Sequence, residues 1–367
     1  MKLVSLSCLL AASCAFGAVS VSSPTNNSTS SAPVHFVASA STGCSKGVSA
    51  MGIYTAPFVL AYKVSGSNLN TYLGLAAGTY NTVVQEWDNC GSSSKTAITL
   101  TVSGSSTVPL SNHVFLVLEE NHSYSSVIGS SAMPYLNSLA SKYGLATQYY
   151  ANTHPSIGNY FMLTAGQIIT NNDSLCSTVT QDNIVRHLLT TGKTWKAYAE
   201  SLPSAGYTGC GMGSYVKRHN PLAYFSDVAN SSEKYNLVPF SNFAGDLANQ
   251  RLPNFSFIVP NLLNDAHDGS LSTADSWLKS NILPLIASST FQKDGLLILV
   301  FDESVDTDTQ HGGGHVAAVL VGPKVKPASK STVLYQHQNV LKTVMKALGL
   351  SSFPGAASSA SAMTDLY

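Results

Sequence analysis

Acidic, amide and imidazole side chains gather at the ends of four apolar runs in this sequence. Carboxylates grouped in this way repel one another unless a cation or protons lie between them. Oxygen atoms of Glu, Asp and Asn are the ligands that a hard divalent cation prefers, so the grouping predicts a site for one or two divalent metal ions. The residues are Glu119, Glu120, Asn121 and His122 after the run at 113–118, Asn261, Asp265, His267 and Asp268 after 255–260, Asp302 and Glu303 after 296–301, and His311 and His315 before 316–322.

A single acidic pair after a strand is more often a helix cap or a turn than a metal site. Only 10% of the residues are charged, so four polar groups at corresponding strand ends favour chemistry over chance. Glu119 and Glu120 cannot both face the strand end comfortably, and period-two alternation does not decide between them. Asp306 and Asp308 are typical of a solvated loop, and a second cation there is the alternative.

A candidate nucleophile stands at Ser156, within the segment Thr-His-Pro-Ser-Ile-Gly-Asn-Tyr. Pro155 and Gly158 indicate a turn that leads into a helix, and Gly166 is a typical helix end. Taken alone, Ser156 is an ordinary helix N-cap, which contributes about 1 kcal/mol to stability. The start of a helix is also an anion site, because backbone N–H groups and the helix dipole point at it.

Phosphoryl transfer needs a hydroxyl beside a metal, with the phosphate held by amide groups. Ser156 would supply that hydroxyl if the strand-end carboxylates hold a metal next to it. His154 and Asn159 flank Ser156 in the sequence and are predicted to donate hydrogen bonds to phosphate oxygens.

The elements that must position these residues are predicted strands and helices in alternation. Unbroken apolar strands are typical of a parallel sheet covered on both faces, and the alternation favours an α/β fold with a mostly parallel sheet and helices on both faces. Ligands of such sheets bind beyond the carboxyl ends of the strands. The predicted strands are 113–118, 194–200, 255–260, 296–301 and 316–322, and the predicted helices are 133–144, 156–166, 275–289 and 337–349.

The first third of the chain has a different pattern. Residues 1–18 are typical of a secretory signal peptide, which predicts a secreted or periplasmic protein. A lipid anchor on Cys14 is disfavoured, because Ala11 stands where such signals prefer Leu. Residues 19–32 have the Ser- and Thr-rich composition of a linker. Short alternating runs at 33–104 predict a small β-sandwich that resembles immunoglobulin-like domains.

The charges and cysteines limit the possible partners. The formal net charge is zero, so no basic excess is available to bind nucleic acid, and no apolar segment after the signal is long enough to span a membrane. Four cysteines remain after the signal. We expect the disulfides Cys44–Cys90 and Cys176–Cys210, because each pair then stays within one predicted domain.

Seven short motifs occur in an order that resembles the phosphoesterase family, which holds bacterial acid phosphatases, phosphatidylinositol-phosphate phosphatases and phospholipases C. That family belongs to the alkaline phosphatase-like superfamily, and the resemblance covers about residues 111–367. The motifs are Leu-Glu-Glu-Asn-His-Ser-Tyr, His-Pro-Ser-Ile-Gly-Asn-Tyr, Lys-Arg-His-Asn-Pro, Pro-Asn-Leu-Leu-Asn-Asp-Ala-His-Asp, Asp-Ser-Trp-Leu, Phe-Asp-Glu and Gly-Gly-Gly-His.

The resemblance implies a role for each matching residue. It implies an alkaline phosphatase-like fold for residues 111–367 and a phosphoserine intermediate on Ser156. Asp265 and His267 match a catalytic segment, and His219 and His315 match further histidines that contact the phosphate. The implied metal ligands are Glu120, Asn121, Ser156, Asp302 and Glu303.

Two departures from the family pattern bear on the substrate. His122 stands where several relatives have Arg, and the segment after Glu303 lacks the Gly-Gly-plus-aromatic pattern of phospholipases. These departures favour a metal-dependent phosphomonoesterase of the acid phosphatase kind. The expected substrate is a phosphorylated small molecule, a phosphoinositide or a phospholipid head group, and the protein is expected to be a monomer. A phospholipase C-type phosphodiesterase is the alternative, and a non-catalytic surface-binding protein is a further one.

Overall fold

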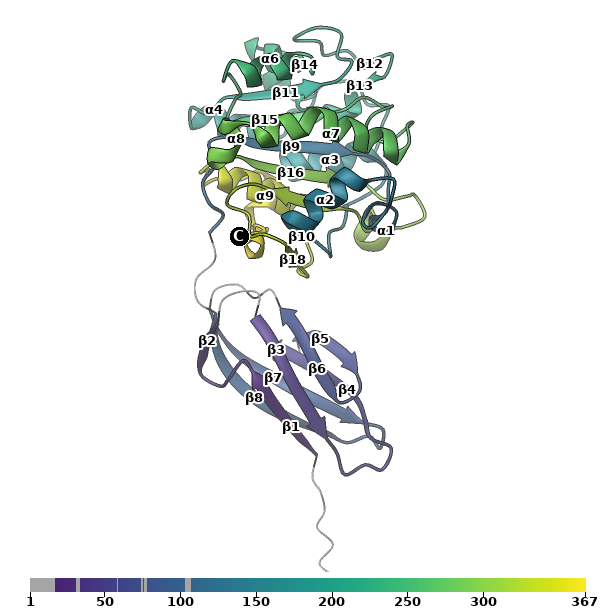
Figure 1. Ribbon diagram of the computed structural model, residues 1–367, viewed down its shortest axis with the longest axis vertical. Helices are drawn as coiled ribbons and strands as arrows, with labels where there is room; N and C mark the ends of the chain where they lie inside the picture. The colour runs from purple at the N-terminus through teal and green to yellow at the C-terminus, as the bar shows by residue number, and fades with distance from the viewer. Residues whose placement is uncertain (1–16, 31–33, 58, 74, 76–77, 103–106) are drawn as a thin grey trace, which may run out of the picture. The chain divides into compact units, whose positions relative to one another are not determined.

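The chain folds into two compact units, Met1–Ser106 and Thr107–Tyr367. A computed structural model describes residues 17–367 except 31–33, 58, 74, 76–77 and 103–106 (Figure 1). The predicted signal peptide lies almost wholly outside the described residues. Val108 packs in the core of the second unit, so that unit begins a few residues before the predicted position 111.

The first unit consists of two β-sheets that enclose one hydrophobic core. Its buried residues come from both sheets; Val34 and Phe36 belong to one, and Met51 and Val84 to the other. The expected β-sandwich is therefore present, and its likeness to immunoglobulin domains stays a prediction. The sheet orders are β1 (Ala18–Ser23), β3 (Val34–Ser41), β6 (Asn68–Leu73), and β2 (Ser28–Ser30), β8 (Ser93–Val102), β7 (Gly78–Asp88), β4 (Val48–Ala56), β5 (Val59–Ser65).

The prediction of a linker at residues 19–32 is wrong. This segment contains most of β1 and all of β2; β1 pairs with β3 and β2 pairs with β8. The Ser-rich composition hides a strand because only alternate residues of β1, such as Val19, turn toward the core. The intervening Ser side chains face outward, where polarity is no obstacle to pairing.

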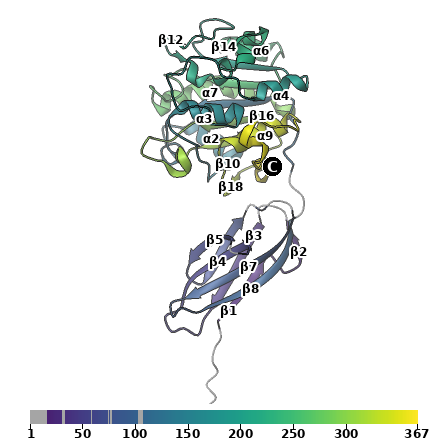
Figure 2. The ribbon, with the colours of Figure 1, turned by 180° about the vertical axis from the view of Figure 1, so that it is seen from behind.

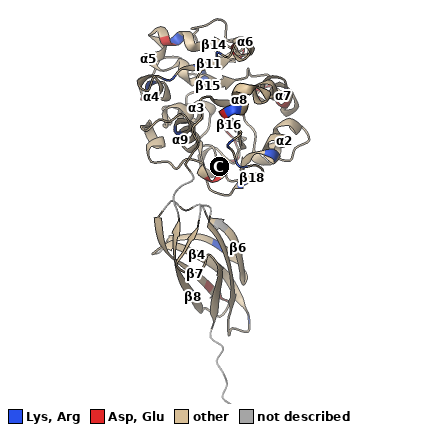
Figure 3. Cartoon of the chain, turned by 60° about the vertical axis from the view of Figure 1, so that its left-hand side comes forward, with Lys and Arg blue, Asp and Glu red and all other residues tan. Residues whose placement is uncertain are grey.

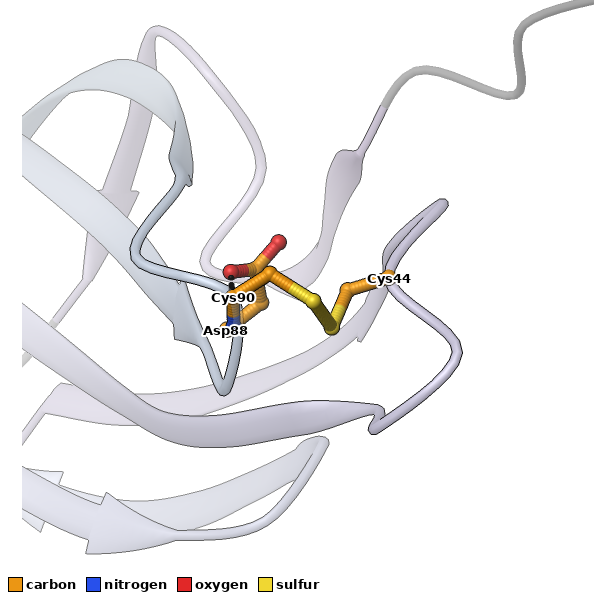
Figure 4. Close-up of side chains that lie close together, drawn as sticks. All are labelled: Cys44, Asp88 and Cys90. Atoms are coloured by element: carbon orange, nitrogen blue, oxygen red, sulfur yellow. Dashed lines mark hydrogen bonds between the residues drawn. A yellow bond between two sulfur atoms is a disulfide. The ribbon is translucent and has the colours of Figure 1, made fainter.

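The predicted disulfide Cys44–Cys90 joins the segments that follow β3 and β7 (Figure 4). The carboxylate of Asp88 accepts hydrogen bonds from the backbone N–H of Cys90 at 2.9 Å and from the Thr42 hydroxyl at 2.8 Å. The second predicted disulfide, Cys176–Cys210, is also present and lies within the second unit. Each bond therefore closes a loop inside one unit.

The second unit is built on a mixed eight-stranded sheet. β15, β9 and β16 are parallel neighbours at its centre, and β17 runs antiparallel to β16. The expectation of a mostly parallel sheet thus holds for the centre of the sheet, whereas β17 makes the sheet mixed. The strand order is β14 (Leu237–Pro239), β11 (Trp195–Ala199), β15 (Phe255–Val259), β9 (Val114–Glu119), β16 (Leu296–Phe301), β17 (Ala318–Val321), β10 (Gly144–Ala146), β18 (Ser329–Ser331).

Helices cover both faces of this sheet, as expected. α2 (Pro134–Lys142) packs with α7 (Leu271–Ala287) on one face, and α3 (Ser156–Ala165) packs with α9 (His337–Ala347) on the other (Figures 1 and 2). α7 starts four residues before the predicted 275, because the Ser270 side chain caps it by accepting a hydrogen bond from an amide of its first turn. Among the described residues, no helix has the length and apolar character needed to cross a bilayer.

Strand direction brings the polar residues to one edge of the sheet. β15, β9 and β16 all end at this edge, and the antiparallel β17 begins there. The residues that follow the first three strands therefore lie at the same edge as His315, which comes shortly before β17. The chain carries 19 basic and 19 acidic residues in all, and Figure 3 colours the described ones blue and red. Glu120, Asp265 and Asp302 meet at this edge, which is therefore where the chemistry of this unit lies.

We predict that replacing Cys44 and Cys90 together by Ser lowers the stability of the first unit by about 2–4 kcal/mol, because the disulfide restricts the unfolded chain. Hydrogen exchange followed by mass spectrometry should show faster exchange in peptides of the first unit alone. Equal acceleration in peptides of the second unit would contradict the expectation that this disulfide stabilises the first unit alone.

Candidate active site

Ser156 is the first residue of α3 and is almost fully buried. Pro155 is the N-cap residue, and no side-chain cap hydrogen bond is made there. The Ser156 hydroxyl instead donates toward two carboxylates, with Oγ 3.0 Å from Oε1 of Glu303 and 3.2 Å from Oε2 of Glu120. The ordinary explanation of Ser156 as a helix cap is therefore wrong.

α3 begins at Ser156, and a glycine at its C-terminal end holds the helix in place. Gly166 adopts the left-handed backbone conformation, with φ 66°. A Cβ atom at this position would lie 2.5 Å from the carbonyl oxygen of Pro354, so only glycine fits. The predicted helix of about ten residues between Ser156 and Gly166 is thus present as expected.

Three buried carboxyl groups surround the Ser156 hydroxyl. Burial, with Asp302 as the next cause, raises the pKa of Glu120 well above its usual value. Burial and the charge of Asp302 raise the pKa of Glu303 to about 9. Burial also raises the pKa of Asp302 itself. These groups cannot all be ionised at neutral pH without a positive partner.

The carboxyl cluster fits a divalent cation. Oδ2 of Asp302 is buried and has no hydrogen-bond partner among the described residues. An orphaned carboxylate oxygen is costly in a protein interior unless something compensates its charge. Oxygen atoms of Glu120, Asp302, Glu303 and Ser156 form a donor set that suits a hard cation.

Asn121 follows β9 in a left-handed backbone conformation, with φ 55°. Asn tolerates this conformation better than most residues do. Its backbone N–H donates to Oδ1 of Asp302 at 3.3 Å, and Oδ1 also accepts from the N–H of Glu303 at 2.6 Å. The turn at Asn121 thus ties the end of β9 to the end of β16.

His219 lies between two carboxyl groups. Nδ1 of its ring lies 3.2 Å from Oδ2 of Asp265, and Nε2 lies 3.2 Å from Oε1 of Glu120. The second contact has ion-pair length, although the N–H direction at Nε2 does not point at that oxygen and the atom makes no hydrogen bond. Burial, then the charge of Arg218, lowers the pKa of His219 to about 3. Both ring nitrogens of His219 therefore face carboxylates in this structure, and its contact with phosphate stays a prediction.

Asp265 and His267 lie together at this edge, as their motif predicts. Oδ1 of Asp265 accepts a hydrogen bond from the backbone N–H of His267 at 2.8 Å, and burial raises the pKa of Asp265 to about 7. Nδ1 of His267 lies 2.7 Å from Oδ1 of Asp268, and the His267 side chain remains 26% exposed. His267 is therefore accessible from solvent, whereas Asp265 is enclosed.

His154 is close to the cluster, and its ring contacts Glu303. Its Nδ1 lies 2.7 Å from Oε2 of Glu303, and its Nε2 lies 3.0 Å from the carbonyl oxygen of Asp308. Both ring nitrogens of His154 therefore have protein partners, and its contact with phosphate stays a prediction. Asp306 approaches His154 only to 4.0 Å with a side chain that is 96% exposed.

Asp308 is held by hydrogen bonds within its own loop. Its carboxylate accepts hydrogen bonds from the Ser304 hydroxyl and from the backbone N–H groups of Gln310 and His315. These bonds outweigh its partial burial and lower the pKa of Asp308. Asp308 shapes the loop that leads into β17, as a loop residue would.

Asn159 bonds to the backbone of the loop before Ser156, which gives it a structural role beside its predicted phosphate contact. Its Oδ1 accepts hydrogen bonds from the backbone N–H groups of Asn152 and Thr153 at 2.9 and 3.1 Å. Its Nδ2 donates to the carbonyl oxygen of Thr153 at 2.7 Å. The side chain is fully buried and holds the loop that delivers Ser156.

His315 lies between two tyrosine rings. Its ring is stacked on Tyr124 at 4.3 Å and on Tyr150 at 4.8 Å, and its Nε2 lies 3.1 Å from the carbonyl oxygen of Thr147. Burial lowers the pKa of His315. None of the contacts recorded for it joins it to Ser156, so its predicted phosphate contact is not seen.

Glu119 and Glu120 point to different surroundings, as strand alternation requires. Both carboxyl oxygens of Glu119 are buried without a hydrogen-bond partner among the described residues. Burial and the charge of Asp265 raise the pKa of Glu119 well above its usual value. Glu120 is the one bonded to Ser156, which agrees with the residue that the family resemblance implies.

Three residues of this region were missed by the sequence analysis. The Tyr160 hydroxyl donates a short hydrogen bond to Oε1 of Glu120. Oδ1 of Asp173 accepts a hydrogen bond from the Ile157 N–H at 3.1 Å, and Oδ2 lies 3.6 Å from Nε of Arg218. Tyr160 and Arg218 lie within motifs that could have drawn attention to them. Asp173 lies in an irregular loop and carried no such signal.

Comparisons with known proteins agree with these motifs. Residues 130–351 match the family model described as Phosphoesterase family. The phosphatidylinositol-3-phosphatase of Mycobacterium tuberculosis is 34% identical over 264 residues, which cover 71% of this chain and 85% of that protein. The acid phosphatase of Aspergillus fumigatus is 34% identical over 254 residues, which cover 66% of this chain and 56% of that protein.

A likeness to solved structures supports the fold alone. The lipoteichoic acid synthase LtaP of Listeria monocytogenes has a TM-score of 0.50 and 10% identity, over 68% of this chain and 75% of that one. The expected α/β fold agrees with this likeness, and the expected mostly parallel sheet is mixed because β17 runs antiparallel to its neighbours.

We predict that Asn159→Ala lowers the free energy of unfolding by about 2–4 kcal/mol, because two buried N–H groups of the loop lose their acceptor. Urea denaturation measures this loss. The exposed Asn249→Ala serves as the control and should change stability by less than about 0.5 kcal/mol. A fully stable Asn159→Ala protein that binds inorganic phosphate more weakly would contradict the structural role.

Proposed function

The chain belongs to the Phosphoesterase family and is a phosphoric ester hydrolase, and we propose that it cleaves phosphoric monoesters with Ser156 as the nucleophile. The observation that carries this proposal is the Ser156 hydroxyl, shared between carboxylates of Glu303 at 3.0 Å and Glu120 at 3.2 Å. A buried serine at a helix start, among carboxyl groups from two parallel strands, is equipped to react rather than to cap.

Five residues would hold a divalent cation in this site. A cation bound there supplies a Lewis acid that lowers the pKa of a hydroxyl ligand and offsets charge on the phosphoryl oxygens. The orphaned Oδ2 of Asp302 supports this assignment, as do the raised pKa values of the carboxyl groups. The residues are Glu120, Asn121, Ser156, Asp302 and Glu303.

The proposed reaction consists of two successive displacements at phosphorus, each assisted by residues of the site. Oε1 of Glu303 accepts the hydrogen bond of Ser156 and is placed to take its proton as Oγ bonds to phosphorus. The bond from phosphorus to the leaving oxygen breaks, and the accessible His267 protonates that oxygen. Water then loses a proton to His267 and attacks the phosphoserine, the bond from phosphorus to Ser156 Oγ breaks, Oγ regains its proton from Glu303, and phosphate is released. Two inversions give retention of configuration at phosphorus.

Arg218 supplies a fixed positive charge for the phosphoryl group. One of its terminal nitrogens lies 3.3 Å from Nε2 of His267, and its Nε lies 3.6 Å from Asp173. A guanidinium group matches the planar spacing of phosphate oxygens. We therefore propose Arg218 as a phosphate-binding side chain in addition to the predicted residues His154, Asn159, His219 and His315.

The names of the relatives favour a monoester substrate. A phosphatidylinositol-3-phosphatase and several acid phosphatases are similar to this chain, and each name denotes removal of a terminal phosphate. We therefore propose a phosphorylated small molecule or a phosphoinositide as the substrate. The two disulfides support an extracellular or periplasmic location, which suits either substrate.

We predict that Ser156→Ala reduces phosphomonoester hydrolysis by about a thousandfold or more, because the nucleophile is lost. Release of phosphate from p-nitrophenyl phosphate measures this. Ser256→Ala removes another buried serine hydroxyl, in β15, and is the matched control. Wild-type protein should cleave bis-p-nitrophenyl phosphate far more slowly. Faster cleavage of the diester would favour the phosphodiesterase alternative, and unchanged hydrolysis by Ser156→Ala would remove Ser156 from its role.

We predict that Asp302→Asn lowers the metal content of the purified protein by at least about tenfold, because one anionic ligand oxygen is lost. Elemental analysis measures the content. Asp275→Asn changes a buried carboxylate that accepts two backbone hydrogen bonds outside the site and should keep the metal. EDTA should abolish hydrolysis reversibly. Full metal content in Asp302→Asn would contradict the proposed ligand set.

A further inference from the structure

We propose that Tyr160, His219 and Asp265 form a buried support that fixes the carboxylate of Glu120, so that one oxygen alone faces Ser156 and the cation. This inference rests on the proposed function, because it assigns positioning residues to a metal ligand of that site. Among the described residues, no recorded side-chain hydrogen bond joins Tyr160, His219 or Asp265 to Ser156 or Asp302.

The two oxygens of Glu120 have different surroundings. Oε2 accepts the hydrogen bond of Ser156 at 3.2 Å. Oε1 accepts the short hydrogen bond of the Tyr160 hydroxyl and lies 3.2 Å from Nε2 of His219. The support therefore occupies Oε1 and leaves Oε2 turned toward the nucleophile.

The ring of His219 is held from two directions. It is stacked on the ring of Tyr160, with centroids 5.1 Å apart and planes only 5° from parallel. Its Nδ1 lies 3.2 Å from Oδ2 of Asp265, which sets the orientation of the ring within the stack. Both rings and the Asp265 carboxyl group are buried, so solvent does not compete for these contacts.

Asp265 also holds the backbone of Glu120. Its carbonyl oxygen accepts a hydrogen bond from the Glu120 N–H at 2.8 Å. Asp265 therefore fixes the main chain of the ligand and orients the His219 ring, which lies against Oε1 of Glu120. Such a closed set of contacts removes the rotational freedom that a glutamate would otherwise lose on binding a cation.

Groups that orient a metal ligand typically change metal affinity by about 10- to 100-fold when they are removed. Tyr160→Phe keeps the ring and its stacking and removes only the hydroxyl. Tyr198→Phe is a matched control, because Tyr198 is buried and its hydroxyl also donates to a carboxylate, Asp246, at 2.8 Å outside the site.

The test uses the purified full-length chain dialysed against increasing concentrations of EDTA, followed by elemental analysis. We expect Tyr160→Phe to lose half its metal at about tenfold less chelator than wild type, and Tyr198→Phe to match wild type. Equal retention by Tyr160→Phe and Tyr198→Phe would overturn the support while the proposed function stands. A wild-type protein without metal would overturn both.

A second pair of variants tests His219 even if Tyr160→Phe does not fold. The amide nitrogen of Gln can occupy the place of Nε2, whereas that of Asn reaches only the place of Nδ1. We expect His219→Gln to retain metal within about threefold of wild type and His219→Asn to lose it at about tenfold less chelator. The same loss in both variants would show that His219 only fills space, and would overturn its role.

Discussion

The structure of the second unit, at the edge of its sheet, depends on the repulsion among buried carboxyl groups. Glu120, Asp302 and Glu303 converge on one hydroxyl, and burial raises the pKa of each. Such a cluster is stable only with protons or a cation inside it. The fold meets this constraint by placing the cluster where backbone N–H groups and tyrosine and serine hydroxyls can donate to it.

The direction of the strands creates this convergence from segments that are far apart in the sequence. Glu120 and Asp302 follow parallel neighbours β9 and β16, so their backbones are in register, as the pairing of Phe301 with Glu119 indicates. Asp265 follows β15 on the other side of β9. α3 then delivers Ser156 to the same edge from the opposite face of the sheet to α7 (Figure 2).

The sequence was enough to predict elements and ligands whose signals are local. Apolar runs gave the central strands, and the carboxylates after them gave the cluster. The hydrogen-bond partners of Asn159 and His315 lie in loops whose paths no local pattern specifies, so these contacts needed coordinates. Asp173 reaches the start of α3 across an irregular loop, so its role needed coordinates. The first strand was mistaken for a linker because its outward side chains are polar.

The pairing of the cysteines has a consequence for how the chain matures. Among the described residues, Cys44 joins Cys90 and Cys176 joins Cys210, so each cysteine bonds to its nearest neighbour along the sequence. The loops that the two bonds close, 44–90 and 176–210, do not overlap along the chain, so either bond can form without constraining the segment that carries the other.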